Sequence, residues 1–529
     1  MKTLFKVYNN LNEVNTSTLL MFTTEEYIEN FIKEKGLCKC GTKCDCGEKC
    51  NCEKCPLQQA IYEMDFKGKK AQTAIIGSKN YKFDRIVFCG LGKESELSKI
   101  IVENIGYKTL KFLKINKIKD ITCLFNTKID DEGNLLFPDE IHDTDFDILY
   151  SNLVFGFIMG DYQFNKYLTG EKLKAKKNPV EEINFVVKNL KSIEDLMKEK
   201  ELVRDNVFFC RDLVNEPANV IYPESLVAVC KDFKKLGIKV NVLSEKDMKK
   251  LGMGSLLAVG QGSDKEPYMV ILEWNGDKDN KDRPLAFVGK GVTFDSGGLS
   301  LKPGNSMDTM KCDMSGSATV ISLIKLLAMR KAKVNAVAVA ALVENMPSGK
   351  SDKVGDIVRS MSGQTVEVMN TDAEGRMILA DALYYAVTKY NPKLVVDLAT
   401  LTGAICVALG EKYAGLFTNN DELSKQLERA GEETSERVWR MPLSKLGGFY
   451  DKQVDSEIAD VRNTGKTRDG GAITAAQFLQ RFINNHEKWA HIDIAATAFV
   501  TQDGFLTKKD ATGYGVRLLN QLIKDNYEK

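Results

Sequence analysis

At 529 residues the chain is too long for a single hydrophobic core, so at least two domains are expected. Its 74 basic and 73 acidic residues leave a net charge of +1, which argues against a nucleic-acid-binding or membrane-binding surface. The longest apolar stretch, residues 336–343, suits a buried strand and is too short to span a membrane. The N-terminus lacks the continuous apolar core of a secretory signal, so a cytoplasmic protein is expected.

Residues 1–195 alternate short strand-like runs with helical stretches, and this pattern predicts a small α/β domain. The expected strands are residues 73–76, 85–89, 121–125 and 185–187. Gly90-Leu91-Gly92 is a weak dinucleotide-binding signal, because Ser95 stands where a third glycine is needed. Residues 192–211 predict a long connecting helix, within which we place a linker helix at 196–210.

A cysteine-rich insertion at residues 37–56 interrupts the first domain. Its seven cysteines are Cys38, Cys40, Cys44, Cys46, Cys50, Cys52 and Cys55. Their spacings resemble metallothionein-like clusters, and thiolates select zinc or copper(I), so a second metal cluster is one hypothesis. The alternative is a solvated insertion whose thiols are merely tolerated; disulfides are disfavoured in a cytoplasmic protein. The other six cysteines lie in apolar contexts and are expected to be reduced core residues.

Residues 211–529 also alternate strands with helices, and the expected strands are residues 239–242, 268–273, 285–288, 334–343 and 393–398. This alternation predicts an α/β domain with a mostly parallel central sheet covered by helices on both faces. Ligands of such sheets collect at the carboxyl ends of the strands. Lys290 and Thr400 are both expected just past strand ends, and therefore near a ligand.

The segment Asn-Thr-Asp-Ala-Glu-Gly-Arg at residues 370–376 precedes an apolar helical stretch at 377–390. On one turn entering that helix, Asp372 and Glu374 can face a common point, with Arg376 beside them. Carboxylates so placed suit Mg²⁺, Mn²⁺ or Zn²⁺. Taken alone, the segment is equally consistent with a charged helix N-terminus, where acids are stabilised by the helix dipole.

A glycine-rich segment at residues 288–303 follows a predicted buried strand and contains Lys290, Asp295 and Lys302. Its glycines are expected to let the backbone turn sharply and approach a ligand closely. It is not a P-loop, because Gly291 stands where Ser or Thr is needed. Asp313 follows, ahead of a second apolar helical stretch. The chain has only three histidines, so any metal here must be held chiefly by carboxylates.

Together with three further segments, these two resemble the leucyl (cytosol) aminopeptidase family of two-metal exopeptidases. The further segments are Arg-Asp-Leu-Val-Asn-Glu-Pro at 211–217, Leu-Ala-Thr-Leu-Thr-Gly at 398–403 and His-Ile-Asp-Ile-Ala at 491–495. The resemblance covers residues from about 200 to 520 at the expected spacings. The first 190 residues match the family loosely, and the cysteine-rich insertion departs from its pattern.

The resemblance implies two divalent metal ions per chain, Zn²⁺ or Mn²⁺, with Mg²⁺ or Co²⁺ accepted at the more exchangeable position. The implied metal ligands are Lys290, Asp295, Asp313, Asp372 and Glu374. Lys290 binds a cation only as a neutral amine, which requires a strongly lowered pKa. The metals share a water and lower its pKa. Lys302 stabilises the oxyanion, and Arg376 holds a bicarbonate ion that carries the proton.

The resemblance places the substrate side chain among Met310, Thr400, Gly403 and Ala495, and implies that the backbone of Leu401 holds the peptide. Small residues and a methionine suit leucine- or methionine-sized side chains, and a methylene is worth only about 1–3 kcal/mol, so broad tolerance is expected. The family forms homohexamers that admit peptides. Three alternatives stay open: a cysteinylglycine dipeptidase using the same site, a DNA-binding accessory protein, and a metal-storage module built on the cysteines.

Overall fold

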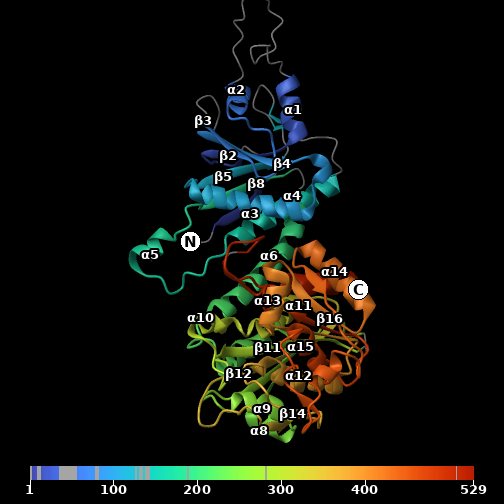
Figure 1. Ribbon diagram of the computed structural model, residues 1–529. Helices are drawn as coiled ribbons and strands as arrows, with labels where there is room; N and C mark the ends of the chain where they lie inside the picture. The colour runs from blue at the N-terminus through green and yellow to red at the C-terminus, as the bar shows by residue number, and fades with distance from the viewer. Residues whose placement is uncertain are drawn as a thin grey trace, which may run out of the picture. The chain divides into compact units, whose positions relative to one another are not determined.

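The computed structural model describes residues 3–8, 13–34, 56–77, 83–125, 128–129, 135–136, 143–187, 190–279, 283–507 and 509–528 (Figure 1). The chain divides into two compact units, Met1–Arg204 and Asp205–Lys529. A single helix, α6 (Leu190–Asn215), covers the stretch in which the sequence predicts a linker helix. The cysteine cluster predicted as a second metal site lies outside the described residues.

The N-terminal unit contains a six-stranded sheet whose neighbouring strands are all parallel, except for an antiparallel pair at one edge. The strand order is β1 (Leu4–Tyr8), β8 (Glu182–Val186), β5 (Asp120–Phe125), β2 (Thr18–Thr24), β4 (Arg85–Gly92) and β3 (Thr73–Gly77). Helices α3 (Lys99–Ile115) and α4 (Asp143–Gly160) pack closely at Gly106, which has no side chain there. A Cβ at this position would lie 2.2 Å from the carbonyl oxygen of Leu153. The remaining elements are α1 (Glu25–Glu34), α2 (Pro56–Glu63), α5 (Gly170–Ala175), β6 (Lys128–Ile129) and β7 (Leu135–Leu136).

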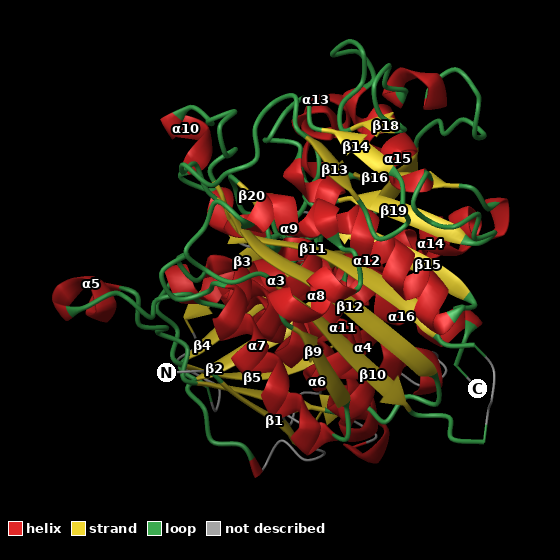
Figure 2. Ribbon diagram, turned by 90° about the horizontal axis from the view of Figure 1, so that it is seen from below, coloured by secondary structure: helices red, strands yellow, loops and turns green. Residues whose placement is uncertain are grey.

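The C-terminal unit is built on an eight-stranded sheet with four parallel strands at its centre and antiparallel pairings toward both edges. The strand order is β17 (Val438–Arg440), β16 (Ala414–Thr418), β19 (Trp489–Asp493), β15 (Leu394–Ala399), β11 (Leu285–Asp295), β12 (Asn335–Asn345), β10 (Tyr268–Asn275) and β9 (Lys239–Leu243). Figure 2 shows the long strands β11 and β12 side by side with helices around them. The predicted α/β class with a mostly parallel sheet is confirmed.

Two helices, α11 (Ser315–Met329) and α12 (Glu374–Tyr390), cover opposite faces of this sheet. Successive strand residues point to opposite faces. On β11, a Cβ on Gly289 would meet the Gly316 carbonyl oxygen of α11 at 2.6 Å, whereas the next side chain, Lys290, reaches Gly375 of α12. The segment Gly304–Met329, which includes α11, is long and apolar enough to span a membrane. However, 89% of its most apolar window is buried inside the structure, as in a core helix that is hydrophobic all round.

Smaller elements surround the sheet. The helices are α7 (Pro223–Lys231), α8 (Glu245–Lys250), α9 (Gly254–Gly260), α10 (Gly304–Met307), α13 (Gly403–Leu409), α14 (Asp421–Thr434), α15 (Gly471–Gln480) and α16 (Val516–Asn526). A three-stranded sheet consists of β13 (Ile357–Arg359), β14 (Thr365–Glu367) and β18 (Val461–Arg462), and β20 (Phe499–Val500) pairs with β21 (Asp510–Ala511). The six cysteines outside the cluster are free; five are buried, as predicted, whereas Cys406 is only half-buried.

The structure corrects the prediction that Lys290 lies past a strand end. Strand β11 continues to Asp295, so Lys290 is a buried residue inside it. Gly289 and Gly291 make no turn here; they leave room for a close approach, because a Cβ on Gly291 would lie 2.5 Å from the Ala341 carbonyl oxygen of β12. The sharp turn comes later, at Gly297, where φ is +86°. Thr400 directly follows β15, as predicted.

Candidate active site

The ligand residues implied by the resemblance meet at the carboxyl end of the central parallel strands. Asp295 ends β11, and Glu374 begins α12 two residues after Asp372. Asp313 lies in the turn between the short 3₁₀ helix Met310–Cys312 and α11. Open α/β sheets bind their ligands at this edge because the connecting loops leave the sheet there.

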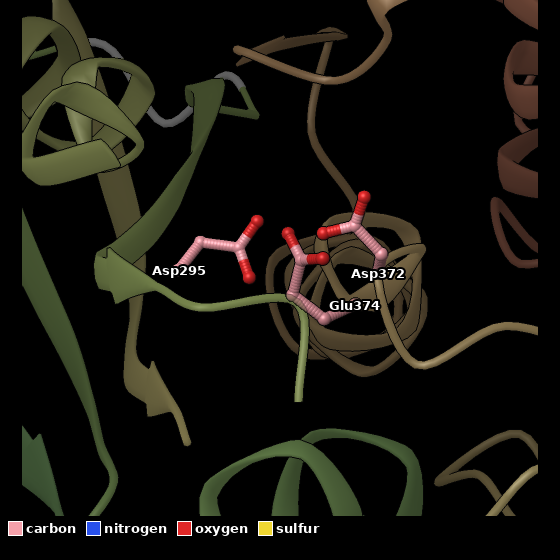
Figure 3. A group of neighbouring side chains, drawn as sticks. All are labelled: Asp295, Asp372 and Glu374. Atoms are coloured by element: carbon pink, nitrogen blue, oxygen red, sulfur yellow. The ribbon is translucent and has the colours of Figure 1, made fainter. Parts of the chain in front are cut away.

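Three carboxylates form a cluster whose side chains point toward one another (Figure 3). One oxygen from each of Asp295, Asp372 and Glu374 lies within 4.8 Å of the others. Asp295 and Glu374 are each 2% exposed, and Asp372 is half-buried. Burial raises the pKa of Asp295 and of Asp372, and the neighbouring carboxylates raise both further. Three carboxylates buried this close together repel one another, and positive charge between them would stabilise their ionised forms.

Lys290 joins Asp313 to this cluster. Its Nζ lies 2.8 Å from Asp313 Oδ2 and 2.8 Å from Glu374 Oε1, and donates to the Thr400 carbonyl oxygen. Burial by itself lowers the pKa of Lys290, but the surrounding carboxylates outweigh it and the net direction is upward. A neutral amine at this position therefore requires the additional positive charge of cations. A Cβ on Gly375 would lie 2.7 Å from Nζ, so a larger residue after Glu374 would displace the Lys290 side chain.

Lys302 stands on the other side of the cluster. Its Nζ lies 2.8 Å from Asp295 Oδ2 and 2.5 Å from Asp372 Oδ1. Burial lowers the pKa of Lys302, but these carboxylates reverse the shift and raise it, so the side chain is an ammonium. Two ammonium groups thus flank four carboxylates, and the side chains alone carry excess negative charge.

The donor set fits divalent cations. Glu374 Oε2 is buried and has no hydrogen-bond partner among the described residues, which is costly for a carboxylate oxygen unless something positive binds it. Oxygen ligands with one amine suit Mn²⁺, Mg²⁺ or Zn²⁺. Within the described ranges no histidine joins the cluster. His491 is fully buried in the middle of β19, with Nδ1 2.6 Å from Asp397 Oδ1, which fits a structural role.

Asn345, the last residue of β12, supports the cluster and is absent from the sequence-based site. Its Nδ2 donates to Asp295 Oδ1 at 2.9 Å and to the Thr371 carbonyl oxygen at 3.0 Å. The Gly297 N–H also donates to Asp295 Oδ1, at 2.8 Å. One oxygen of Asp295 is therefore fixed by the protein, and the other faces Lys302. The signal available in the sequence was a polar residue ending an apolar strand at the same sheet edge as Asp295.

Arg376 lies apart from the ion pairs, on the first turn of α12. It is buried, and Nη1 donates to the Asn463 carbonyl oxygen at 2.8 Å. Its Nε has no partner in the described part of the chain. Burial lowers the pKa of Arg376 to about 10. Asn463 also holds the start of the segment 370–376, since its side chain accepts from the Met369 N–H and donates to the Asn370 carbonyl oxygen. A buried guanidinium with an unused N–H is suited to bind an anion.

The residues predicted to line the substrate pocket come from neighbouring loops. Leu401 and Gly403 follow β15, and Ala495 follows the adjacent strand β19. Leu401 and Ala495 are half-buried, and a Cβ on Gly403 would meet open space. Thr400 has a further contact that the sequence did not predict: its hydroxyl donates to Asp313 Oδ1 at 2.7 Å and so supports a candidate ligand. Met310 is half-buried, three residues before Asp313.

Comparison with known proteins agrees with this geometry. Residues 208–520 match the cytosol aminopeptidase family, catalytic domain, and residues 51–171 match the N-terminal domain of that family. A "Probable cytosol aminopeptidase" of Phytoplasma mali (strain AT) is 50% identical over 72% of this chain and 75% of its own length. One of Nitrobacter winogradskyi is 44% identical over 89% of this chain and 91% of its own length.

Solved structures give the same result. A mutant of tomato leucine aminopeptidase superposes with a TM-score of 0.81 and 31% identity, covering 99% of this chain and 97% of its own. The bottromycin maturation enzyme BotP, in complex with Mn, superposes with a TM-score of 0.77 and 26% identity, covering 97% of this chain and 99% of its own.

Proposed function

This chain belongs to the cytosol aminopeptidase family and is a metal-dependent aminopeptidase of that class, and we propose that two divalent cations, Zn²⁺ or Mn²⁺, carry its activity. The observation that carries the proposal is the buried cluster of Asp295, Asp372 and Glu374, with its excess negative charge and an unpartnered Glu374 oxygen. The manganese complex of BotP supports the same metal chemistry.

The side chains divide into two overlapping ligand sets. One cation would be held by Lys290, Asp295, Asp313 and Glu374, and the more exchangeable one by Asp295, Asp372 and Glu374. When bound, such a pair polarises a carbonyl group, lowers the pKa of water and binds a free amine. Amine binding restricts the enzyme to the N-terminal residue of a peptide. Asp295 and Glu374 contribute to both sets, in keeping with their nearly complete burial.

Lys302 and Arg376 act on the substrate and the proton. The Lys302 ammonium is placed to meet the negative charge that develops on the carbonyl oxygen, and cations on Asp295 and Asp372 would free it from those carboxylates for this role. Arg376, whose Nε–H has no partner among the described residues, would hold a bicarbonate ion, and this anion would supply a base for the proton that hydrolysis sets free. The hydrogen bond from Nη1 to Asn463 fixes the guanidinium for this role.

The substrates are peptides with a leucine- or methionine-like first residue, with broad tolerance. Gly403, beside open space, and the half-buried Leu401 and Ala495 are consistent with room for such a side chain, and the family resemblance adds Met310 as an apolar wall. The alternative expected from the sequence, a cysteinylglycine dipeptidase using the same site, has no support from the relatives and structures compared above. Relative rates on Cys-Gly and Leu-amide separate the two activities.

We place the enzyme in the cytoplasm, following the name of its relatives, and propose a homohexamer. Large apolar side chains exposed on the C-terminal unit support self-association: Val407 is 89% exposed and Phe449 72%. Light scattering tests this proposal, since it predicts a mass six times that of one chain. A monomer at micromolar concentration would contradict it.

Metal exchange tests the two-cation proposal. Dialysis against a chelator removes one cation readily and abolishes Leu-amide hydrolysis, and Mn²⁺, Co²⁺ or Mg²⁺ restores hydrolysis at altered rates. The unequal exchange follows from Lys290, which completes only one of the two ligand sets. Simultaneous loss of both cations at one rate would contradict the assignment.

A further inference from the structure

Asp493, the last residue of β19, is a fully buried carboxylate outside the ligand sets. Its Oδ1 accepts from the N–H groups of Leu401 and Ala495 at 3.1 and 3.2 Å. Its Oδ2 accepts from the Thr402 hydroxyl at 2.7 Å. All three partners belong to the two loops that leave the sheet beside the candidate cation site.

These contacts join both sides of the proposed pocket. Strands β15 and β19 are parallel neighbours, with Ala399 opposite Asp493, so the loops after them emerge next to each other. Leu401 belongs to the first loop and Ala495 to the second. Thr402 also accepts from the Ile405 N–H at 3.2 Å and caps helix α13, so Asp493 orients that cap as well.

The first loop is fixed at its other end by the candidate ligands. The Thr400 hydroxyl donates to Asp313, and the Thr400 carbonyl oxygen accepts from Lys290. Residues 400–402 are thus held between the cation site and Asp493. Substrate held by the Leu401 backbone is then placed at a defined distance from the cations. A displacement of about 1 Å between such groups costs up to roughly 10²-fold in rate.

Burying an ionised carboxylate costs free energy, and the groups around Asp493 offset part of that cost. Burial raises the pKa of Asp493, whereas His491 and the three donors lower it. His491 is itself paired with Asp397 on the neighbouring strand. The three groups that donate to Asp493 all belong to the pocket loops. Burying this carboxylate therefore fixes the geometry of those loops.

We propose that Asp493 is a positioning residue that sets side-chain selectivity: it fixes Leu401, Thr402 and Ala495 relative to the cation site without binding a cation. The inference rests on the proposed function for the identity of the pocket. It extends that function by naming one buried group on which both walls of the pocket depend.

The test compares Asp493→Asn with Asp397→Asn, a matched buried aspartate whose side-chain contacts are with His491 and Trp489 and not with the pocket loops. Asp493→Asn keeps an acceptor for the two N–H groups but loses the anionic acceptor of the Thr402 hydroxyl. We expect kcat/KM for Leu-amide to fall about 10–100-fold, mainly through KM, and the preference for Leu-amide over Ala-amide to fall at least threefold. Bound metal stays at the wild-type level. Asp397→Asn lowers thermal stability and leaves the preference unchanged.

Variants of Thr402 keep the test decisive if Asp493→Asn does not fold. Thr402→Val removes the hydroxyl and should shift the Leu-to-Ala preference in the same direction, and Thr402→Ser should restore it. An unchanged preference in a folded Asp493→Asn or Thr402→Val, with wild-type metal content, overturns the inference while leaving the proposed function intact. Loss of metal from Asp493→Asn would show instead that the residue supports the cation site. Failure of the proposed function would appear separately, as hydrolysis by metal-free wild-type protein.

Discussion

Replacing Lys302 by alanine separates a group that acts on the transition state from a metal ligand. In the structure Nζ contacts Asp295 Oδ2 and Asp372 Oδ1, two candidate ligand oxygens, so lysine and cation compete for the same carboxylates. An ammonium and an oxyanion each carry a unit charge, and two unit charges about 4 Å apart interact by about 4 kcal/mol at an effective dielectric constant of about 20. Loss of one oxyanion donor costs about 2.7–4 kcal/mol, so kcat should fall by roughly 10²–10³.

The expected metal result has the opposite sign. Because Lys302→Ala removes a competing cation, affinity for Mn²⁺ should be unchanged or higher, and bound metal should stay at the wild-type level. The assay combines steady-state hydrolysis of Leu-amide with elemental analysis of the same sample. The control is Lys353→Ala, whose Nζ lies 3.8 Å from Asp356 on an exposed loop and should not affect either measurement. Loss of a cation from Lys302→Ala, or an unchanged kcat, would refute the reasoning.

Arg376→Ala should lower kcat by about 10²-fold or less, since buffer anions replace part of the proton transfer, and should abolish stimulation by added bicarbonate; stimulation that persists would contradict this. Asn345→Ala leaves the Thr371 carbonyl oxygen without its side-chain donor and Asp295 Oδ1 with one donor fewer, so unfolding free energy should fall by about 1–3 kcal/mol and a chelator should strip metal faster. Burial raises the pKa of Asp295 and Asp313, which therefore hold protons to higher pH. Cation binding must displace those protons, so Mn²⁺ affinity should fall as the pH is lowered, with proton release visible by calorimetry in buffers of different ionisation enthalpy.

Local spacing made part of the site predictable. Asp372 and Glu374 lie two residues apart at a helix start, so the sequence alone indicates that they face one point, and Figure 3 shows them doing so. The alternation of strands and helices likewise predicts the parallel sheet, because each parallel connection needs a crossover. Asp295 and Asp313 were named from the family resemblance, which supplied the long-range pairing that spacing cannot.

What the sequence did not reveal depends on contacts between distant segments. Asn345 reaches Asp295 across 50 positions, and Asn463 reaches Asn370 across 93. A single asparagine after an apolar strand is an ordinary strand end until its partner is known. The glycines near Lys290 led to the prediction of a turn, because glycine occurs both in sharp turns and inside strands where another part of the backbone packs closely. Strand β2 (Thr18–Thr24) was missed because a short apolar run carries no period that distinguishes strand from helix.

The most direct test of the two-cation account is elemental analysis and Leu-amide hydrolysis on one purified sample, repeated as metal is removed and returned. The account predicts two divalent cations per chain at full occupancy, activity that disappears with the first cation lost, and recovery when Mn²⁺ is restored. Full activity in a metal-free preparation would contradict it.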